Sequence, residues 1–160
     1  MAVVYVGLGS NLGDRERSLQ EALEKMKRIP HTQWLRTSQW HETDPVGVPP
    51  QGKFLNGTAE LETSLPPGDL LAHLQRIERE LGRPAGHDSR SPRVIDLDLL
   101  AYDSLVLNEP NLKIPHPRLH ERLFVLAPLA ELSPDWKHPV LERTVRELRS
   151  QCGSSAESRP

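Results

Sequence analysis

The sequence has little of what stabilises secreted or membrane proteins. It holds one cysteine, Cys152, in 160 residues, so no intramolecular disulfide can form. No segment approaches the ~20 apolar residues that cross a bilayer, and the apolar N-terminus is too short for a signal peptide and has no basic flank. We therefore expect a cytoplasmic protein without a membrane partner.

Aromatic residues and net charge are also scarce. Three Trp, two Tyr and two Phe are present, and 20 basic against 22 acidic side chains leave a formal net charge of -2. A sheet that binds RNA displays stacking aromatics and a basic surface, so this composition argues against a nucleic-acid partner. Any anionic ligand must be held by a local cluster of charges.

Proline is abundant instead, with 15 residues, or about 9% against an average of about 5%. Many of the prolines and glycines lie in two segments, 41–52 and 83–93, which predicts two long loops. Long loops in small domains are usually functional or disordered. The modest apolar content of 36% fits one core, so we expect a single domain over residues 1–152 and a disordered polar tail over 153–160.

Hydrophobic periodicity predicts the order β-α-β-β-α-β. The expected strands span 3–8, 32–40, 54–63 and 94–102, and the expected helices span 13–28 and 64–81. This order is the split βαβ plan of the ferredoxin-like fold, an α+β class with an antiparallel sheet and helices packed on it. We also expect a bulge at Gly57 and, in the C-terminal additions, a helix over 119–132 interrupted at Pro128.

Two carboxylates stand out in the last strand, VIDLDLLAY at 94–102. Side chains alternate along a strand, so Asp96 and Asp98 project from one face about 6 to 7 Å apart, together with Leu100 and Tyr102. Oxygen ligands at that spacing suit Mg²⁺ that bridges to phosphate. Taken alone, the pair is more often a solvated strand face.

The preceding loop adds cations to this region. Arg83, Arg90 and Arg93 lie between the second helix and the acidic pair. Guanidinium groups beside an acidic metal site supply the charge neutralisation that phosphoryl transfer needs. For Arg93, next to the apolar strand, this role is favoured over a solvated linker, whereas for Arg90 both interpretations stay open.

Other residues are suited to ligand contacts. Phe54 and Asn56 share a strand face and offer a planar heterocycle a stacking surface and an amide. Gln75 and Glu78 lie side by side on the second helix, where a solvated helix face is the favoured alternative. His116 lies between two prolines and could bond a phosphate, although a lone histidine is more often incidental.

The glycine-rich nucleotide motifs are absent or incomplete. There is no GxxxxGK[ST] sequence, so a nucleotide would be held without a P-loop. Gly7, Gly9 and Gly13 follow the first strand, but the third glycine comes one position too late for the dinucleotide fingerprint. We interpret this run as a tight turn and a helix cap.

Six segments carry a combined signature. They are GLGSNLGDR at 7–15, TDPVG at 43–47, FLNGTAELET at 54–63, LQRIERELGR at 74–83, SPRVIDLDLLAYD at 91–103 and IPHPRLHERLFVLAPLAEL at 114–132. In order and spacing they resemble the 6-hydroxymethyl-7,8-dihydropterin pyrophosphokinase family of folate biosynthesis. The resemblance implies transfer of the β,γ-pyrophosphoryl group of ATP to the hydroxymethyl oxygen of the reduced pterin, with release of AMP, on a ferredoxin-like core.

The resemblance also implies roles for individual residues. Asp96 and Asp98 match the acidic pair that holds two Mg²⁺ ions. Arg83 and Arg93 match two arginines that contact the triphosphate. These four residues form the implied catalytic set. Further positions that match ATP contacts are Gln75, Glu78, Leu99, His116 and Arg122. Positions that match the pterin pocket are Thr43, Asp44, Pro45, Val46, Phe54, Asn56, Asp96 and Phe124. Phe54 and Phe124 would sandwich the pterin, and Asn56 would read its polar edge.

The chain departs from the family pattern mainly in the loop over 83–93. Some relatives carry further basic residues and a Trp there, where this chain has Ala85, Gly86, Ser89 and Arg90, and Pro117 replaces an aromatic of some relatives. The lid chemistry of those positions is therefore not transferred.

The expected partners are ATP and the pterin, with a monomer favoured. The alternative is a ferredoxin-like nucleotide- or RNA-binding module without catalysis, which would not need the acidic pair and the arginine loop together.

Overall fold

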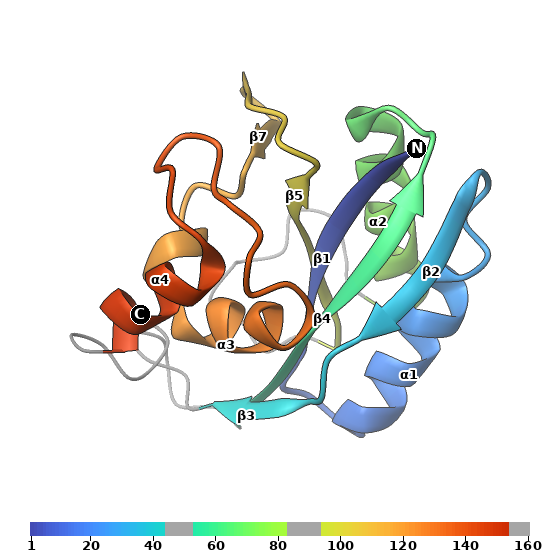
Figure 1. Ribbon diagram of the computed structural model, residues 1–160. Coiled ribbons are helices and arrows are strands. Elements are labelled where there is room, and N and C mark those ends of the chain that lie inside the picture. The colour runs from blue at the N-terminus through green and yellow to red at the C-terminus, as the bar shows by residue number, and fades with distance from the viewer. Residues whose placement is uncertain (44–52, 83–93, 154–160) are drawn as a thin grey trace.

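A five-stranded antiparallel sheet organises the chain. The structure, a computed structural model, describes residues 1–43, 53–82 and 94–153. The strands are β1 (Ala2–Ser10), β2 (Thr32–Thr37), β3 (His41–Thr43), β4 (Phe54–Thr63) and β5 (Asp96–Tyr102). Their order is β2-β4-β1-β5, and β3 also pairs with β4 (Figure 1). This order confirms the expected α+β split βαβ core.

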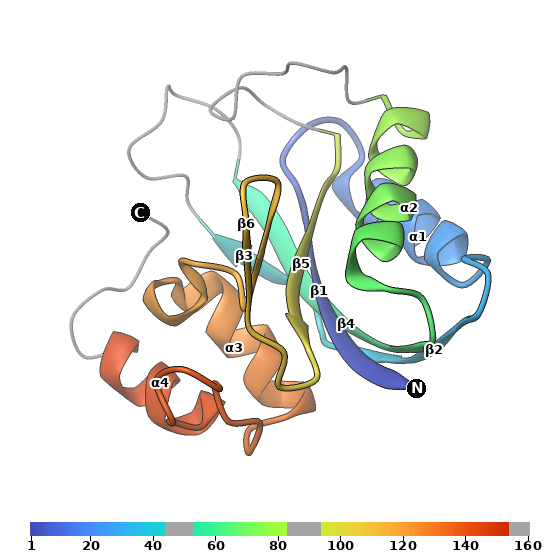
Figure 2. The ribbon, with the colours of Figure 1, turned by 90° about the horizontal axis from the view of Figure 1, so that it is seen from above.

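Two helices cover one face of the sheet. They are α1 (Arg15–Met26) and α2 (Pro67–Glu80), which lie side by side in Figure 2. The side chain of Asp14 caps α1 by accepting a hydrogen bond from the N–H of Arg17 at 3.2 Å. The apolar stripes of both helices are buried against alternate residues of β1, such as Val4 and Val6.

The opposite face of the sheet is partly covered by the C-terminal helices. These are α3 (Leu123–Leu132) and α4 (Val145–Gly153), with a short 3-10 helix over Leu119–Glu121 before them (Figure 2). Leu126 and Leu129 of α3 are fully buried in a second apolar cluster that includes Tyr5 and Leu100 of the sheet. β1 is therefore buried on both faces, because its alternate side chains enter two different clusters.

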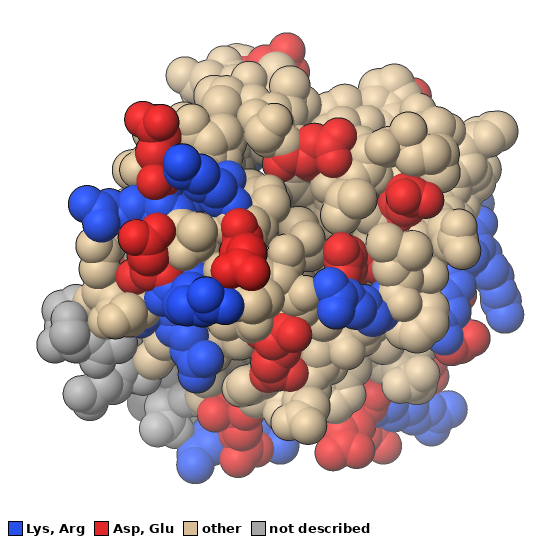
Figure 3. Space-filling model, viewed as in Figure 1, with Lys and Arg blue, Asp and Glu red and all other residues tan. Residues whose placement is uncertain are grey.

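The remaining elements lie at the periphery. β6 (Leu107–Glu109) and β7 (Leu112–Ile114) form a separate two-stranded hairpin. Lysine, arginine, aspartate and glutamate side chains are interspersed on the face in Figure 3, in line with the near-neutral net charge. Within the described ranges, none of the helices has the length and apolar content needed to cross a membrane.

Three expectations about local structure are wrong. His41–Thr43 falls in a predicted loop but forms β3 by pairing with the start of β4, a long-range contact that the local pattern does not reveal. Gly57 makes no bulge, because the β1–β4 register runs without a shift from Ala2 to Ser10. Pro128 does not interrupt α3, and it is buried inside that helix among apolar neighbours.

A bulge does occur in β5. Tyr5 pairs with Ala101 and Val6 pairs with Leu99, so Leu100 is an extra residue in the ladder. Beyond it the side-chain alternation reverses, and Tyr102 packs against the cluster below α1 and α2. The expectation that Tyr102 shares a face with the two aspartates is therefore wrong.

Candidate functional site

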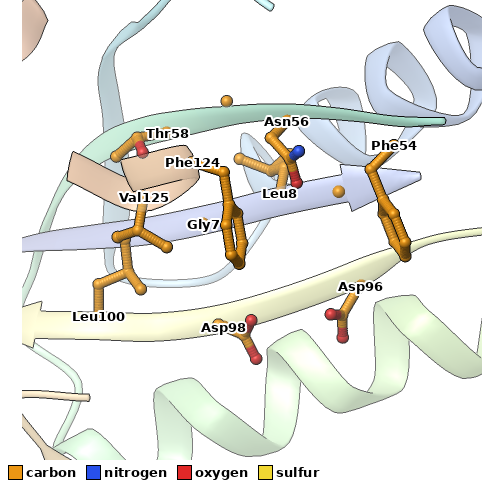
Figure 4. A pocket seen from close by; sticks show the side chains of 12 residues that line it. Gly7, Leu8, Phe54, Asn56, Thr58, Asp96, Asp98, Leu100, Phe124 and Val125 are labelled. Atoms are coloured by element: carbon orange, nitrogen blue, oxygen red, sulfur yellow. The ribbon is translucent and has the colours of Figure 1, made fainter. Parts of the chain in front are cut away.

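A pocket opens on the sheet face that carries α3. Its walls come from the adjacent strands β4, β1 and β5 and from the first turn of α3 (Figure 4). The lining residues are Gly7, Leu8, Gly9, Phe54, Asn56, Gly57, Thr58, Asp96, Asp98, Leu100, Phe124 and Val125. The structure thus brings together five predicted site residues from separate segments: Phe54, Asn56, Asp96, Asp98 and Phe124.

The acidic pair lies on the pocket face of β5. Asp96 and Asp98 are half-buried and pair in the ladder with Gly9 and Gly7 of β1. Since neither glycine has a side chain, neighbouring side chains pack close to β1 beside the carboxylates: a Cβ atom at Gly7 would lie 3.4 Å from Leu100, and one at Gly9 would meet Asn56. Gly7 and Gly9 lie inside β1, so the interpretation as a turn and helix cap is wrong for these two, whereas Gly13, with φ of 70°, lies in the bend directly before the N-cap residue Asp14 of α1.

Glu78 of α2 holds the backbone between the two aspartates. Its buried carboxylate accepts a hydrogen bond from the N–H of Leu97 at 2.8 Å. A charged acceptor makes a stronger hydrogen bond than a neutral one, so this contact fixes the strand on which both aspartates stand. Helix periodicity alone, which favoured a solvated face for Glu78, gave no sign of this contact.

Two carboxylates on one strand face fit a hard cation. Mg²⁺ binds through one or two carboxylates and completes its shell with water and substrate phosphates. Over the residues that the structure describes, no group of three or more His, Cys, Asp or Glu side chains could hold a metal ion. Asp96 and Asp98 are therefore suited to a hard cation whose remaining ligands include water and substrate phosphates.

The upper part of the pocket is aromatic and amidic. Phe54 of β4 and Phe124 of α3 lie on either side of the Asn56 side chain, with both aspartates below (Figure 4). Asn56 is buried, and its Nδ2 donates to Thr43 Oγ1 at 2.8 Å. This hydrogen bond fixes the orientation of the amide, so its donor and acceptor are presented in defined directions.

Gly9 determines how closely Asn56 approaches β1. A Cβ atom at Gly9 would lie 2.9 Å from Asn56 Oδ1, closer than real Cβ contacts. Only glycine permits this packing without a shift of the amide. The alternation of side chains along β1 is enough to predict that positions 7 and 9 share a face. The closeness of Gly9 to Asn56 depends on the pairing of β1 with β4, which one segment does not reveal.

Arg122 brings positive charge toward the acidic pair. Burial lowers its pKa and Arg118 lowers it further, whereas Asp98 and Asp96 act in the opposite direction. Its guanidinium carbon lies 5.5 Å from the centre of the Phe124 ring. Arg122 Nε is buried and has no hydrogen-bond partner in the described part of the chain, so this cation is suited to an anionic ligand.

His116 is a neutral side chain in this environment. Burial lowers its pKa to about 4, and Arg122 acts in the same direction against the opposing effect of Asp96. His116 Nδ1 accepts a hydrogen bond from the N–H of Arg118 at 3.2 Å. In a neutral imidazole the other nitrogen then carries the proton, so Nε2 is a hydrogen-bond donor.

Other predicted positions are not part of the pocket lining. Gln75 is exposed on α2, and Leu99 is buried in the cluster beneath α1 and α2, on the face opposite the aspartates. The predicted residues Asp44, Pro45, Val46, Arg83 and Arg93 lie outside the described residues. Thr43 reaches the site through its hydrogen bond to Asn56.

Comparisons with known proteins identify the family of the chain. The sequence profile of the 7,8-dihydro-6-hydroxymethylpterin-pyrophosphokinase (HPPK) family matches residues 5–134. The chain is 44% identical over 150 residues to the 2-amino-4-hydroxy-6-hydroxymethyldihydropteridine pyrophosphokinase of Pseudomonas aeruginosa, covering 93% of this chain and 91% of that protein. It is 45% identical over 131 residues to the Bacillus subtilis protein of the same name, covering 81% and 77%.

A solved structure shares the fold. The crystal structure of Plasmodium falciparum wild-type HPPK-DHPS with pteroate superposes with a TM-score of 0.75 over 96% of this chain at 16% identity. This chain spans 42% of that longer one. At such low identity, the likeness concerns the fold alone.

Proposed function

The chain belongs to the 7,8-dihydro-6-hydroxymethylpterin-pyrophosphokinase family, and we propose that it carries out the corresponding reaction. Pyrophosphate is transferred from ATP to the hydroxymethyl group of 6-hydroxymethyl-7,8-dihydropterin, giving AMP and the pterin diphosphate in folate biosynthesis. One observation carries the proposal: the acidic pair and the aromatic-amide slot line the same pocket. A heterocycle in the slot would place its substituent toward the phosphates.

The slot is suited to a reduced pterin. Phe54 and Phe124 supply flat apolar surfaces that stack on a heterocycle, and Asn56 supplies an amide donor and acceptor for its polar edge. Specificity follows because a buried amide costs free energy when a ligand leaves it unpaired. We include Asp44, Pro45 and Val46 in the pterin site from the family resemblance.

The lower part of the pocket is suited to the triphosphate. Asp96 and Asp98 would hold two Mg²⁺ ions, which supply charge neutralisation at the phosphates. Arg122 and the Nε2–H of His116 donate to phosphate oxygens, and the neutral His116 does so without titrating near pH 7. Arg83 and Arg93 complete the phosphate contacts in this proposal, with Gln75, Glu78 and Leu99 on the ATP side.

A binding module without catalysis is a poorer fit. RNA-binding ferredoxin-like modules present an open sheet face with aromatics for stacking bases. Here α3 packs on part of that face, with α4 packed against α3 (Figure 2), and Lys, Arg, Asp and Glu are mixed on the surface in Figure 3. What stays open is a pocket between the sheet and the first turn of α3, and it has an acidic side.

The proposal is tested by measuring whether AMP formation depends on Mg²⁺ and on the acidic pair. We expect AMP formation from ATP and the reduced pterin to depend on Mg²⁺ and to fall by about 100-fold or more in Asp98→Asn, because losing a metal ligand removes several kcal/mol of transition-state stabilisation. Asp135→Asn is the matched control, since Asp135 is an exposed acid paired with Arg146 at 3.2 Å. Full activity of Asp98→Asn at every Mg²⁺ concentration would overturn the assignment.

A further inference from the structure

The last turn of α3 contacts residues 36–41, which run from the end of β2 to the start of β3. Glu131 Oε1 accepts a hydrogen bond from the N–H of Gln39 at 2.9 Å, and Oε2 pairs with His41 Nε2. The next residue contributes a third tie, because the carbonyl of Leu132 accepts from Arg36 Nη2 at 2.5 Å. Three contacts thus connect two residues of α3 to three residues of one short segment.

Glu131 is the only polar residue of α3, whose sequence is LFVLAPLAEL. The other side chains are apolar, and Leu126 and Leu129 are fully buried against the sheet. Burial of apolar surface is not directional, so it holds the helix on the sheet without fixing its exact rotation or tilt. Hydrogen bonds are directional, which leaves the ties at the last turn to set the helix orientation.

The orientation of α3 matters because its other end forms a pocket wall. Phe124 comes seven residues before Glu131, which is about 10 Å along the helix at a rise of about 1.5 Å per residue. A tilt of about 10° at the last turn would move the Phe124 end by about 2 Å. A displacement of about 1 Å is enough to impair catalysis, so small changes of tilt affect the slot.

The tied segment also leads to the opposite wall. His41 and Thr43 both belong to β3, and Thr43 Oγ1 accepts the hydrogen bond that orients Asn56. Glu131 therefore links the helix that carries Phe124 to the strand that positions Asn56. Arg36 reinforces the link, because its Nε also pairs with the buried Glu60 of β4 at 2.5 Å.

We propose that Glu131 is a positioning residue for the pterin slot, acting through His41 and Gln39 to fix the spacing between Phe124 and the Asn56 amide. Glu131 is not among the residues that line the pocket. Because the elements that it links carry Phe124 and position Asn56, we expect Glu131 to affect pterin binding and not phosphate binding. This inference rests on the proposed function of the same site.

The test compares Glu131→Ala with Glu131→Gln. Glu131→Ala removes the contacts with Gln39 and His41 and leaves the Arg36–Leu132 hydrogen bond in place. We expect the pterin KM to rise by about three- to tenfold, which is in the range of coupling free energies between contacting groups, and the ATP KM to stay within about twofold of wild type. Glu131→Gln keeps an acceptor for the Gln39 N–H and should recover part of the loss. Equilibrium titration with 6-hydroxymethyl-7,8-dihydropterin should give the tightest binding for wild type, weaker binding for Glu131→Gln and the weakest binding for Glu131→Ala.

The matched control is Glu21→Ala, which breaks the ion pair with Arg17 on α1 at 3.0 Å and should leave both KM values unchanged. His41→Ala approaches the tie from β3, and combining it with Glu131→Ala should add little. Equal rises of the pterin and ATP KM values, an unchanged pterin KM, or fully additive effects would overturn the proposal. Failure of the wild type to make AMP would instead refute the proposed function, so the two failures are distinguishable.

Discussion

Gly9→Ala should weaken pterin binding by displacing Asn56. The added Cβ would lie 2.9 Å from Asn56 Oδ1, so the amide must move by about 0.5 Å to regain an ordinary contact of 3.4 Å. Its hydrogen bond to Thr43, now 2.8 Å, would then be lengthened or misaligned. A misplaced hydrogen bond costs about 1 to 1.5 kcal/mol, so we expect the pterin Kd to rise by about tenfold with little change in ATP binding.

A double-mutant cycle shows whether Asn56 carries this effect. Asn56→Ala should itself weaken pterin binding, and in that background Gly9→Ala should cost little more, because the added methyl group no longer meets the amide. Titration of wild type, both single variants and the double variant with the reduced pterin gives the coupling free energy. The reasoning is refuted if Gly9→Ala costs the same in both backgrounds, or if it weakens ATP binding as much as pterin binding.

Three further changes have defined outcomes. Gly57→Ala places a Cβ 2.4 Å from the Trp40 ring, so urea unfolding should show a loss of about 2 kcal/mol or more, and an unchanged midpoint would contradict the packing. Glu78→Gln should lower AMP formation with little loss of stability, because its amide is a weaker acceptor for the Leu97 N–H, and wild-type turnover would contradict the role of that contact. Burial lowers the pKa of His138, whose Nδ1 accepts two backbone N–H groups; the unfolded state therefore binds more protons, and unfolding free energy should fall as the pH drops below about 6.5. His138→Asn should lose that part of the pH dependence in urea titrations, and an identical pH profile would contradict the assignment.

Local sequence patterns were sufficient for the central fold. The stripe of leucines on α2 and the alternation in β4 each follow from one segment, so periods of 3.6 and two residues predicted them. β3 depends instead on pairing with β4, and three residues carry too little pattern to reveal it. The bulge at Leu100 likewise depends on a neighbouring strand, and it reversed the expected face of Tyr102.

Part of the site could also be predicted from the pattern within a single segment. Asp96 and Asp98 are two apart in one strand, so their shared face follows from the sequence. Their approach to Phe124 requires α3 to fold back over the sheet, and here the family resemblance supplied what periodicity could not. The contact of Glu78 with Leu97 joins α2 to β5 and is visible only in three dimensions.

Product analysis tests the central claim most directly. Incubation of the wild-type chain with ATP, Mg²⁺ and 6-hydroxymethyl-7,8-dihydropterin should release AMP and the pterin diphosphate in equal amounts, as separated by ion-exchange chromatography. The same mixture without the pterin should leave ATP intact. Release of ADP with a pterin monophosphate, or no pterin-dependent consumption of ATP, would contradict the assigned reaction.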